Sequence, residues 1–192
     1  MTTAVNLSLD RHVSDVCKTC FFWLQQLRRV CRSLDTESVK TLVHAFVTSC
    51  IDYCNSVLSF APKKVIDKLQ HVQNAAACLV TETRKYERGL SWLMHDDLHW
   101  LVIPQRVQYK LAVTVHRCLC HRAPRYLADY CVPVSEVAGH QHLRSARCHR
   151  LSVLQVCRSA FGICAFSVAK PRVWNSLPYY LQDPAVDPEQ FR

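Results

Sequence analysis

The chain has 192 residues, which fits one domain of ordinary size, or one domain with an irregular tail. Hydrophobic residues make up 49% and charged residues 20%, which allows a sizeable core and argues against wholesale disorder. The 24 Lys and Arg outnumber the 15 Asp and Glu, for a net charge of +9, and this balance favours a polyanionic partner such as RNA, DNA or an anionic surface.

The sequence shows no membrane or export signal. No stretch approaches the roughly 20 uninterrupted apolar residues that span a bilayer. The first residues lack the basic start and the long apolar run of a signal peptide. We therefore expect no membrane partner and an intracellular chain, in the nucleus or the cytoplasm, whose 12 cysteines are reduced thiols.

The first part of the chain reads as helices. Apolar residues recur at helical spacing in 10–33, 36–58 and 63–81. Asp35 is the expected N-cap of the second helix, and Pro62 opens the third. The apolar face of the first helix comprises Val13, Val16, Cys17, Cys20, Leu24, Leu27 and Cys31. That of the second comprises Leu42, Val43, Phe46, Val47, Cys50, Ile51, Cys54 and Val57. That of the third comprises Val65, Leu69, Val72, Ala76 and Leu79.

The middle of the chain is less regular. Residues 82–90 are polar and predict a loop, and 91–101 predict a short helix or turn. Pro104 opens a fourth clear helix. Its apolar face comprises Val107, Leu111, Val115 and Leu119. Pro124 begins a short helical piece from Arg125 to Tyr130.

Periodicity fades after residue 130. Residues 131–158 predict a loop, with one strand as an option around 151–156. A last helix is expected over 160–177, where Pro171 could kink or split it. The whole pattern predicts a mainly α fold, a compact helical bundle with a looser, partly irregular C-terminal third.

This pattern divides the chain into two parts. Residues 1–130 are expected to form a helical bundle, and residues 131–192 an irregular segment with a short C-terminal helix. The sequence does not indicate an oligomeric state.

Basic residues gather in several places. Arg11, Lys18 and Arg29 share one face of the first helix, opposite its apolar face. Such groups can follow the phosphates of a nucleic acid, although a solvated surface is the alternative for any basic protein. The candidate nucleic-acid-binding residues are Arg11, Lys18, Arg29, Lys63, Lys64, Lys68, Arg84, Lys85, Arg88, Arg144, Arg147 and Arg150.

Cysteine and histidine residues raise the question of a metal. Cys17 and Cys20 have the spacing of a zinc half-site, but both lie on an apolar helix face, which favours core packing. A second group has spacings that match no known zinc knuckle or finger. It comprises Cys118, Cys120, His121, His140, His142, Cys148 and His149. We expect no metal and no other cofactor, with a zinc protein as an alternative, and no local signature supports a cysteine nucleophile.

Asp96 and Asp97 are adjacent, like metal-binding carboxylates of a polymerase. Two-metal phosphoryl transfer needs clustered carboxylates. Here no strand alternation surrounds the pair, and no apolar strand supplies a third Asp. We therefore expect an exposed turn or a helix start, and we assign no catalytic residue.

Four segments carry a family resemblance. In chain order they read Ile51-Asp52-Tyr53-Cys54-Asn55-Ser56, Leu69-Gln70-His71-Val72-Gln73-Asn74-Ala75-Ala76-Ala77, Asp97-Leu98-His99-Trp100-Leu101 and Val173-Trp174-Asn175-Ser176-Leu177-Pro178. From about Leu7 to Arg192, the chain resembles the C-terminal region of the reverse transcriptase of LINE-type, non-LTR retrotransposons, in the jockey-like and chicken-repeat-like group. The matching region is the thumb and post-thumb.

The resemblance has functional implications. In that family the catalytic palm lies upstream of this region, so the resemblance implies a non-catalytic fragment of an RNA-directed DNA polymerase. A polymerase thumb grips the template–primer duplex, which implies weak, non-specific binding of RNA or DNA. A helical protein-interaction module without nucleic-acid binding is the alternative, as is a non-functional translated relic. Cys50 and Cys78 stand where family members usually have Arg, as expected from CpG decay of an old insertion.

Overall fold

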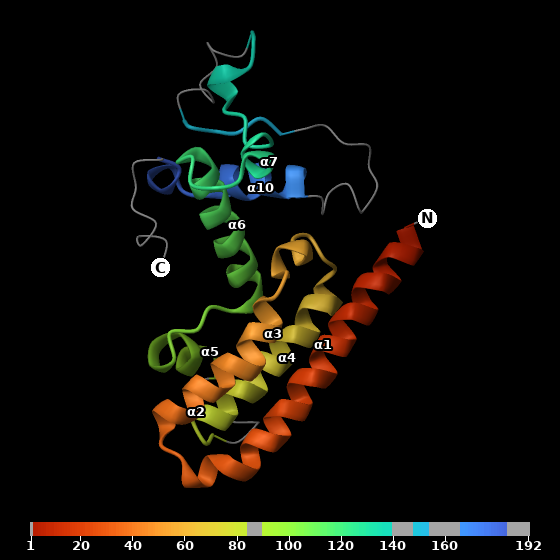
Figure 1. The fold of residues 1–192 in the computed structure, drawn as a ribbon, viewed down its shortest axis with the longest axis vertical. Coiled ribbons are helices and arrows are strands. Elements are labelled where there is room, and N and C mark those ends of the chain that lie inside the picture. Colours follow the sequence, from red (N-terminus) through yellow and green to blue (C-terminus); the bar gives the residue numbers. More distant parts are fainter. Residues whose placement is uncertain (1, 84–89, 140–147, 154–165, 184–192) are drawn as a thin grey trace. The chain divides into compact units, whose positions relative to one another are not determined.

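The computed structural model describes residues 2–83, 90–139, 148–153 and 166–183, which are drawn as ribbons in Figure 1. The chain forms two compact units. Unit 1 comprises residues 1–55 and 61–106, and unit 2 comprises residues 56–60 and 107–192.

Unit 1 is built from helices. They are α1 (Thr2–Val30), the 3-10 turn η1 (Cys31–Ser33), α2 (Thr36–Val43), the π turn η2 (His44–Thr48), α3 (Ser49–Asp52), α4 (Lys63–Val80), α5 (Leu90–Trp92) and the π turn η4 (Leu93–Asp97). Asp35 caps α2 as predicted, because its carboxylate accepts the Ser38 N–H at 3.1 Å. The expected third helix is confirmed as α4, and the expected short helix or turn as α5 and η4.

The core of unit 1 lies where α1 packs along α4 and α2 (Figure 1). All five residues of the predicted α4 face are buried. Among residues 9–30 of α1, the buried residues of the predicted face are Val13, Cys20, Leu24 and Leu27. Val16 and Cys17 are half-buried, as is Cys31 in η1. The first helix begins well before residue 10, so the apolar period located its buried face but not its start.

The second predicted helix needs a correction. A continuous helix over 36–58 is wrong, because α3 ends at Asp52 and Cys54 adopts a positive φ of 53°. Within this segment lies the π turn η2, in which the Ser49 N–H donates a hydrogen bond to the His44 carbonyl, five residues back.

The wider turn changes which side chains face the core. Buried positions then recur at every fourth residue, at Val39, Val43, Val47 and Ile51. The predicted stripe is wrong at Phe46, which lies in η2, and at Cys54 and Val57, which lie beyond the end of α3, since all three are exposed.

Unit 2 is also helical in its described part. Its elements are most of η3 (Asn55–Leu58), α6 (Ile103–Leu119) from Val107 onward, α7 (Arg125–Ala128), the 3-10 turn η5 (Val134–Glu136), α10 (Phe166–Ser176) and the 3-10 turn η6 (Tyr179–Leu181). Pro171 lies inside α10, and the helix continues through it. Residues 160–165 of the predicted last helix lie outside the described residues.

The core of unit 2 is centred on Trp174, which is fully buried. Around it pack the buried side chains Val115, Cys118, Cys131 and Leu151. The only β pairing among the described residues is an isolated bridge between Pro133 and Leu151, so 151–153 form no longer strand, and 154–156 lie outside the described part. The mainly α fold class is confirmed.

Candidate nucleic-acid interface

The first family-like segment fixes the end of α3. The Asp52 carboxylate pairs with the Arg106 guanidinium at 2.6 Å and accepts the Asn55 amide at 3.2 Å. Arg106 also donates to the Leu101 carbonyl at 3.1 Å. Asp52 and Arg106 therefore join two stretches of unit 1 that are far apart in sequence, which is a structural use of Asp52.

The second family-like segment lies in α4 and also joins two stretches of unit 1 that are far apart in sequence. Gln70 accepts the Ile103 N–H at 3.0 Å, and Gln73 donates to the Leu101 carbonyl at 2.7 Å. Gln70 also donates to Asn74 at 2.9 Å. Gln70 and Gln73 thus hold the backbone that leads from the third segment into α6. The first and second segments therefore both hold the stretch from Leu101 to Arg106.

The fourth segment secures the centre of unit 2. Asn175 uses its whole amide on one residue, accepting the Leu151 N–H and donating to the Leu151 carbonyl, both at 2.9 Å. Trp174 donates through its indole N–H to the His149 carbonyl at 2.9 Å. Gln182 donates to the Leu177 carbonyl at 2.7 Å, just after α10 ends. Trp174 and Asn175 in this segment, like Gln70 and Gln73 in the second, thus bond to backbone groups.

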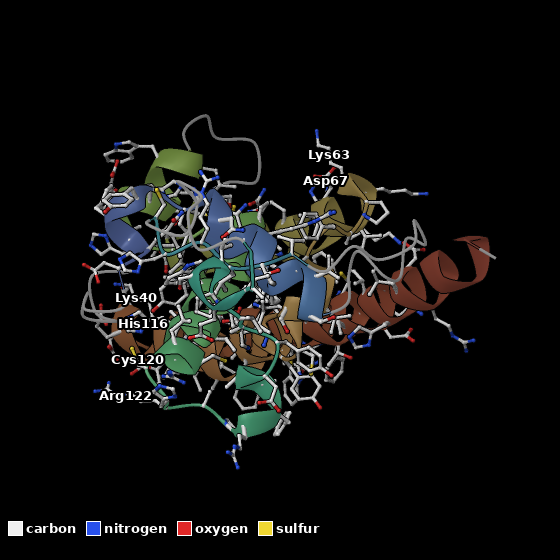
Figure 2. The ribbon with its side chains drawn as sticks, turned by 90° about the horizontal axis from the view of Figure 1, so that it is seen from above. Lys40, Lys63, Asp67, His116, Cys120 and Arg122 are labelled. Atoms are coloured by element: carbon white, nitrogen blue, oxygen red, sulfur yellow. The ribbon has the colours of Figure 1, made fainter. Side chains whose placement is uncertain are left out.

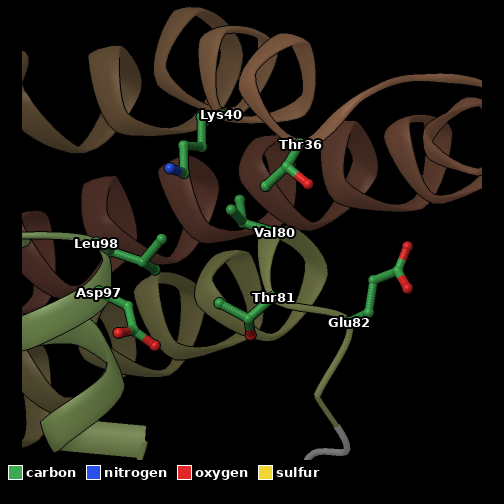
Figure 3. A pocket seen from close by; sticks show the side chains of 7 residues that line it. All are labelled: Thr36, Lys40, Val80, Thr81, Glu82, Asp97 and Leu98. Atoms are coloured by element: carbon green, nitrogen blue, oxygen red, sulfur yellow. The ribbon is translucent and has the colours of Figure 1, made fainter.

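The adjacent aspartates lie in η4, and both are exposed, as predicted for a turn. Asp97 lines an open pocket of about 290 Å³, shown in Figure 3. The pocket is lined by Thr36, Lys40, Val80, Thr81, Glu82, Asp97 and Leu98. Among the described residues, no three His, Cys, Asp or Glu side chains are grouped so that they could hold a metal.

Of the five cysteines in the two candidate metal groups, Cys20 and Cys118 are buried, and the other three are half-buried: Cys17, Cys120 and Cys148. Cys20 is fully buried, its thiol lies 3.8 Å from the Val47 carbonyl, and burial raises its pKa to about 12. Burial also raises the pKa of Cys131, beside Cys118. Cys120 lies 3.7 Å from His116 on the preceding turn of α6 (Figure 2). His140 and His142 lie outside the described residues.

The predicted basic face of α1 is exposed. Arg11, Lys18 and Arg29 all lie on the solvent side of the helix. Lys18 contacts Asp15 at 3.0 Å, and this lowers the pKa of Asp15. Arg28 and Arg32 add further exposed positive charge near the end of the helix. Such charges also suit a helix C-terminus, where they meet the negative end of the helix dipole.

The lysines of α4 divide into two kinds. Lys68 is half-buried and donates to Asp10 at 2.7 Å and Ser14 at 3.0 Å, which lowers the pKa of Asp10 and ties α4 to α1. Lys63 and Lys64 are exposed in the first turn, which carries no acidic residue, and Figure 2 labels Lys63 there. Lys63 and Lys64 place positive charge at the positive end of a helix dipole, where it opposes helix stability.

Most of the remaining candidate nucleic-acid-binding residues lie outside the described part of the chain. Arg150 is described and exposed. Five others lie outside the described residues: Arg84, Lys85, Arg88, Arg144 and Arg147.

Sequence reasoning missed an aromatic group next to the α1 cations. The Phe22 ring meets the Trp23 ring edge-on at 5.5 Å between centroids, and the Trp23 ring stacks on Phe46 at 4.6 Å. We call Phe22, Trp23 and Phe46 the aromatic platform. Its signal was present in the sequence, because Phe22 shares the helical face of Arg11, Lys18 and Arg29.

Comparison with protein-family models, with curated proteins and with solved structures finds no match. No helix in the described part of the chain has both the length and the apolar character needed to cross a bilayer.

Proposed function

We propose that this chain binds RNA or DNA weakly and without sequence preference, as the thumb-like and post-thumb part of a LINE-type reverse transcriptase, and that it performs no catalysis itself. The motif resemblance supports the origin. The charge arrangement of unit 1 supports the binding.

The observation that carries the proposal is a set of exposed cations in unit 1 that lie within 4 Å of no described carboxylate. Within the described residues they form no ion pair, whereas Lys18, Lys40, Lys68 and Arg106 each do. The set comprises Arg11, Arg28, Arg29, Arg32, Lys63 and Lys64. Phosphate groups would neutralise these charges and, at Lys63 and Lys64, would also relieve the unfavourable interaction with the α4 dipole.

The salt dependence of binding tests this proposal. Each phosphate that a cation neutralises releases counterions, so log K should fall with log salt by about 0.7 to 0.9 per contact. The double variant Arg11→Gln, Arg29→Gln should lower the slope by roughly that amount for each residue. Lys40→Gln is the control, because Lys40 is half-buried on α2, outside this set of cations, and pairs with Glu37 at 2.8 Å, so it should change the slope less than either arginine. Fluorescence anisotropy with a labelled oligonucleotide gives K.

Two results would contradict the proposal. Binding that ignores salt between roughly 50 and 200 mM would rule out phosphate contacts and favour a helical protein-interaction module. Template-dependent primer extension that is lost in Asp96→Ala, Asp97→Ala would show that the chain is a catalyst.

A further inference from the structure

Four exposed side chains form one line along α1. At about 100° per residue, Arg11, Lys18, Phe22 and Arg29 fall within about 40° of one another around the helix axis. The buried residues of the helix lie on the opposite side: Val13, Cys20, Leu24 and Leu27. Phe22 therefore stands in the middle of a cationic face, pointing away from the core.

Phe22 is 53% exposed, so its large apolar ring contributes little to the core of unit 1. It is held by its edge-on contact with Trp23, which is stacked on Phe46 with 30° between the ring planes. The aromatic platform is therefore built from two elements, α1 and η2, and presents the exposed rings of Phe22 and Phe46 to solvent.

The π turn η2 accounts for the third ring. The wide turn keeps Val43 and Val47 in the core and leaves Phe46 37% exposed. π turns inside α-helices occur often at functional sites. An exposed Phe46 stacked on Trp23 is consistent with such a role.

The charges along this face are available to a ligand. Arg11 and Arg29 form no ion pair with any residue in the described ranges. Lys18 contacts Asp15, but both side chains are exposed, and pairs of this kind are weak. A phosphate can therefore compete with Asp15 for Lys18.

The combination of rings and cations selects one class of partner. In a duplex the faces of the bases are covered by their neighbours, so an exposed ring has nothing to stack on, whereas an unpaired base offers its face freely. Proteins that bind single strands combine such rings with cations that follow the backbone. We propose that this face of α1 binds single-stranded nucleic acid, with Phe22 stacking on a base and Arg11, Lys18 and Arg29 contacting phosphates.

This inference rests on the proposed function and adds the form of nucleic acid that is preferred. The test uses three labelled probes of equal length: an oligo(dT) strand, the dT·dA duplex and a strand of abasic sites. Abasic strands present phosphates without bases. The protein variants are Phe22→Ala, Phe22→Trp and Phe46→Ala. Tyr180→Ala is the control, since Tyr180 is an exposed ring of unit 2.

Wild-type protein should bind oligo(dT) more tightly than the duplex or the abasic strand. Phe22→Ala should weaken binding to oligo(dT) by about 5- to 150-fold, the range expected for one lost stacking contact, and leave binding to the abasic strand unchanged. Phe46→Ala should act in the same direction, Phe22→Trp should retain binding, and Tyr180→Ala should have no effect. Because Phe22 is exposed, its removal should not unfold the chain, which circular dichroism checks.

Other outcomes separate the two proposals. If all three probes bind equally and Phe22→Ala changes nothing, the preference for single strands is wrong while the proposed function stands. If no probe binds to the wild-type chain, both are wrong. If Phe22→Ala instead converts a dimer into a monomer with unchanged binding, the platform is a self-association surface and the inference is overturned.

Discussion

Asn175 bonds to both backbone groups of Leu151, and Gln70 and Gln73 serve the backbone at Ile103 and Leu101. Amide side chains suit this task because they carry a donor and an acceptor in one plane. Buried backbone groups need such partners when no regular ladder reaches them. The resemblance to a family pattern located these residues, whereas only the structure shows that they act on the backbone.

Asp35 provides a pH-dependent contribution at the scale of one residue. Hydrogen bonds from the Ser38 hydroxyl and backbone N–H lower the pKa of Asp35 below its usual 3.8. Because the folded pKa is depressed, the stabilisation is complete above the unfolded value and is lost as pH falls through the folded value. Asp35→Asn retains a capping oxygen but does not titrate. The difference in urea midpoint between wild type and Asp35→Asn should therefore shrink as pH falls below about 4. A difference that stays constant would show that Asp35 is not ionised as a cap.

The segment that contains α2, η2 and α3 shows where sequence periodicity succeeds and fails. The period of 3.6 placed Val43, Val47 and Ile51 in the core, and all three are buried. It also placed Phe46 there, because periodicity assumes a regular turn and a π turn leaves no simple sequence mark. Periodicity also failed to predict the end of the helix, because apolar residues continue past Asp52 although α3 ends there.

Deleting Ala45, an exposed residue of η2, tests the role of the π turn. One residue fewer turns the five-residue step into an ordinary four-residue step, and Val43 and Val47 then keep core positions three residues apart. The variant should remain helical and lose less stability than the ~2–5 kcal/mol of Leu69→Ala. Phe46 should leave Trp23, so the variant should bind oligo(dT) more weakly. Unfolding of the variant would show that the core requires the π turn.

At the scale of the whole chain, helices and their buried faces follow from local sequence, but the two units do not. Residues 56–60 join residues 107–192, across the intervening α4, and no local pattern indicates such a contact. The division of the chain at residue 130 stays a prediction. The candidate cations of α1 and α4 could be found from spacing alone, whereas the pairing of Lys68 with Asp10 depends on how the two helices pack.

Buried thiols can report on the units separately. Trp174→Ala removes the centre of the unit 2 core and should destabilise that unit by about 3–5 kcal/mol. Brief alkylation followed by mass spectrometry should then label Cys118 and Cys131 while Cys20, in unit 1, stays protected. Leu69→Ala should show the reverse pattern. Simultaneous labelling of all three thiols in either variant would mean that the chain unfolds as one cooperative body.

The discontinuous make-up of unit 2 has a consequence for biosynthesis. A ribosome releases the chain from its N-terminus, and domains generally fold as they emerge. All of unit 1 is available once residue 106 has left the exit tunnel, whereas residues 56–60 must wait for the rest of unit 2. The nascent chain therefore acquires the cationic face of α1 before its Trp174-centred core, and a stop codon after residue 106 would still leave all of unit 1, with this face, in the product.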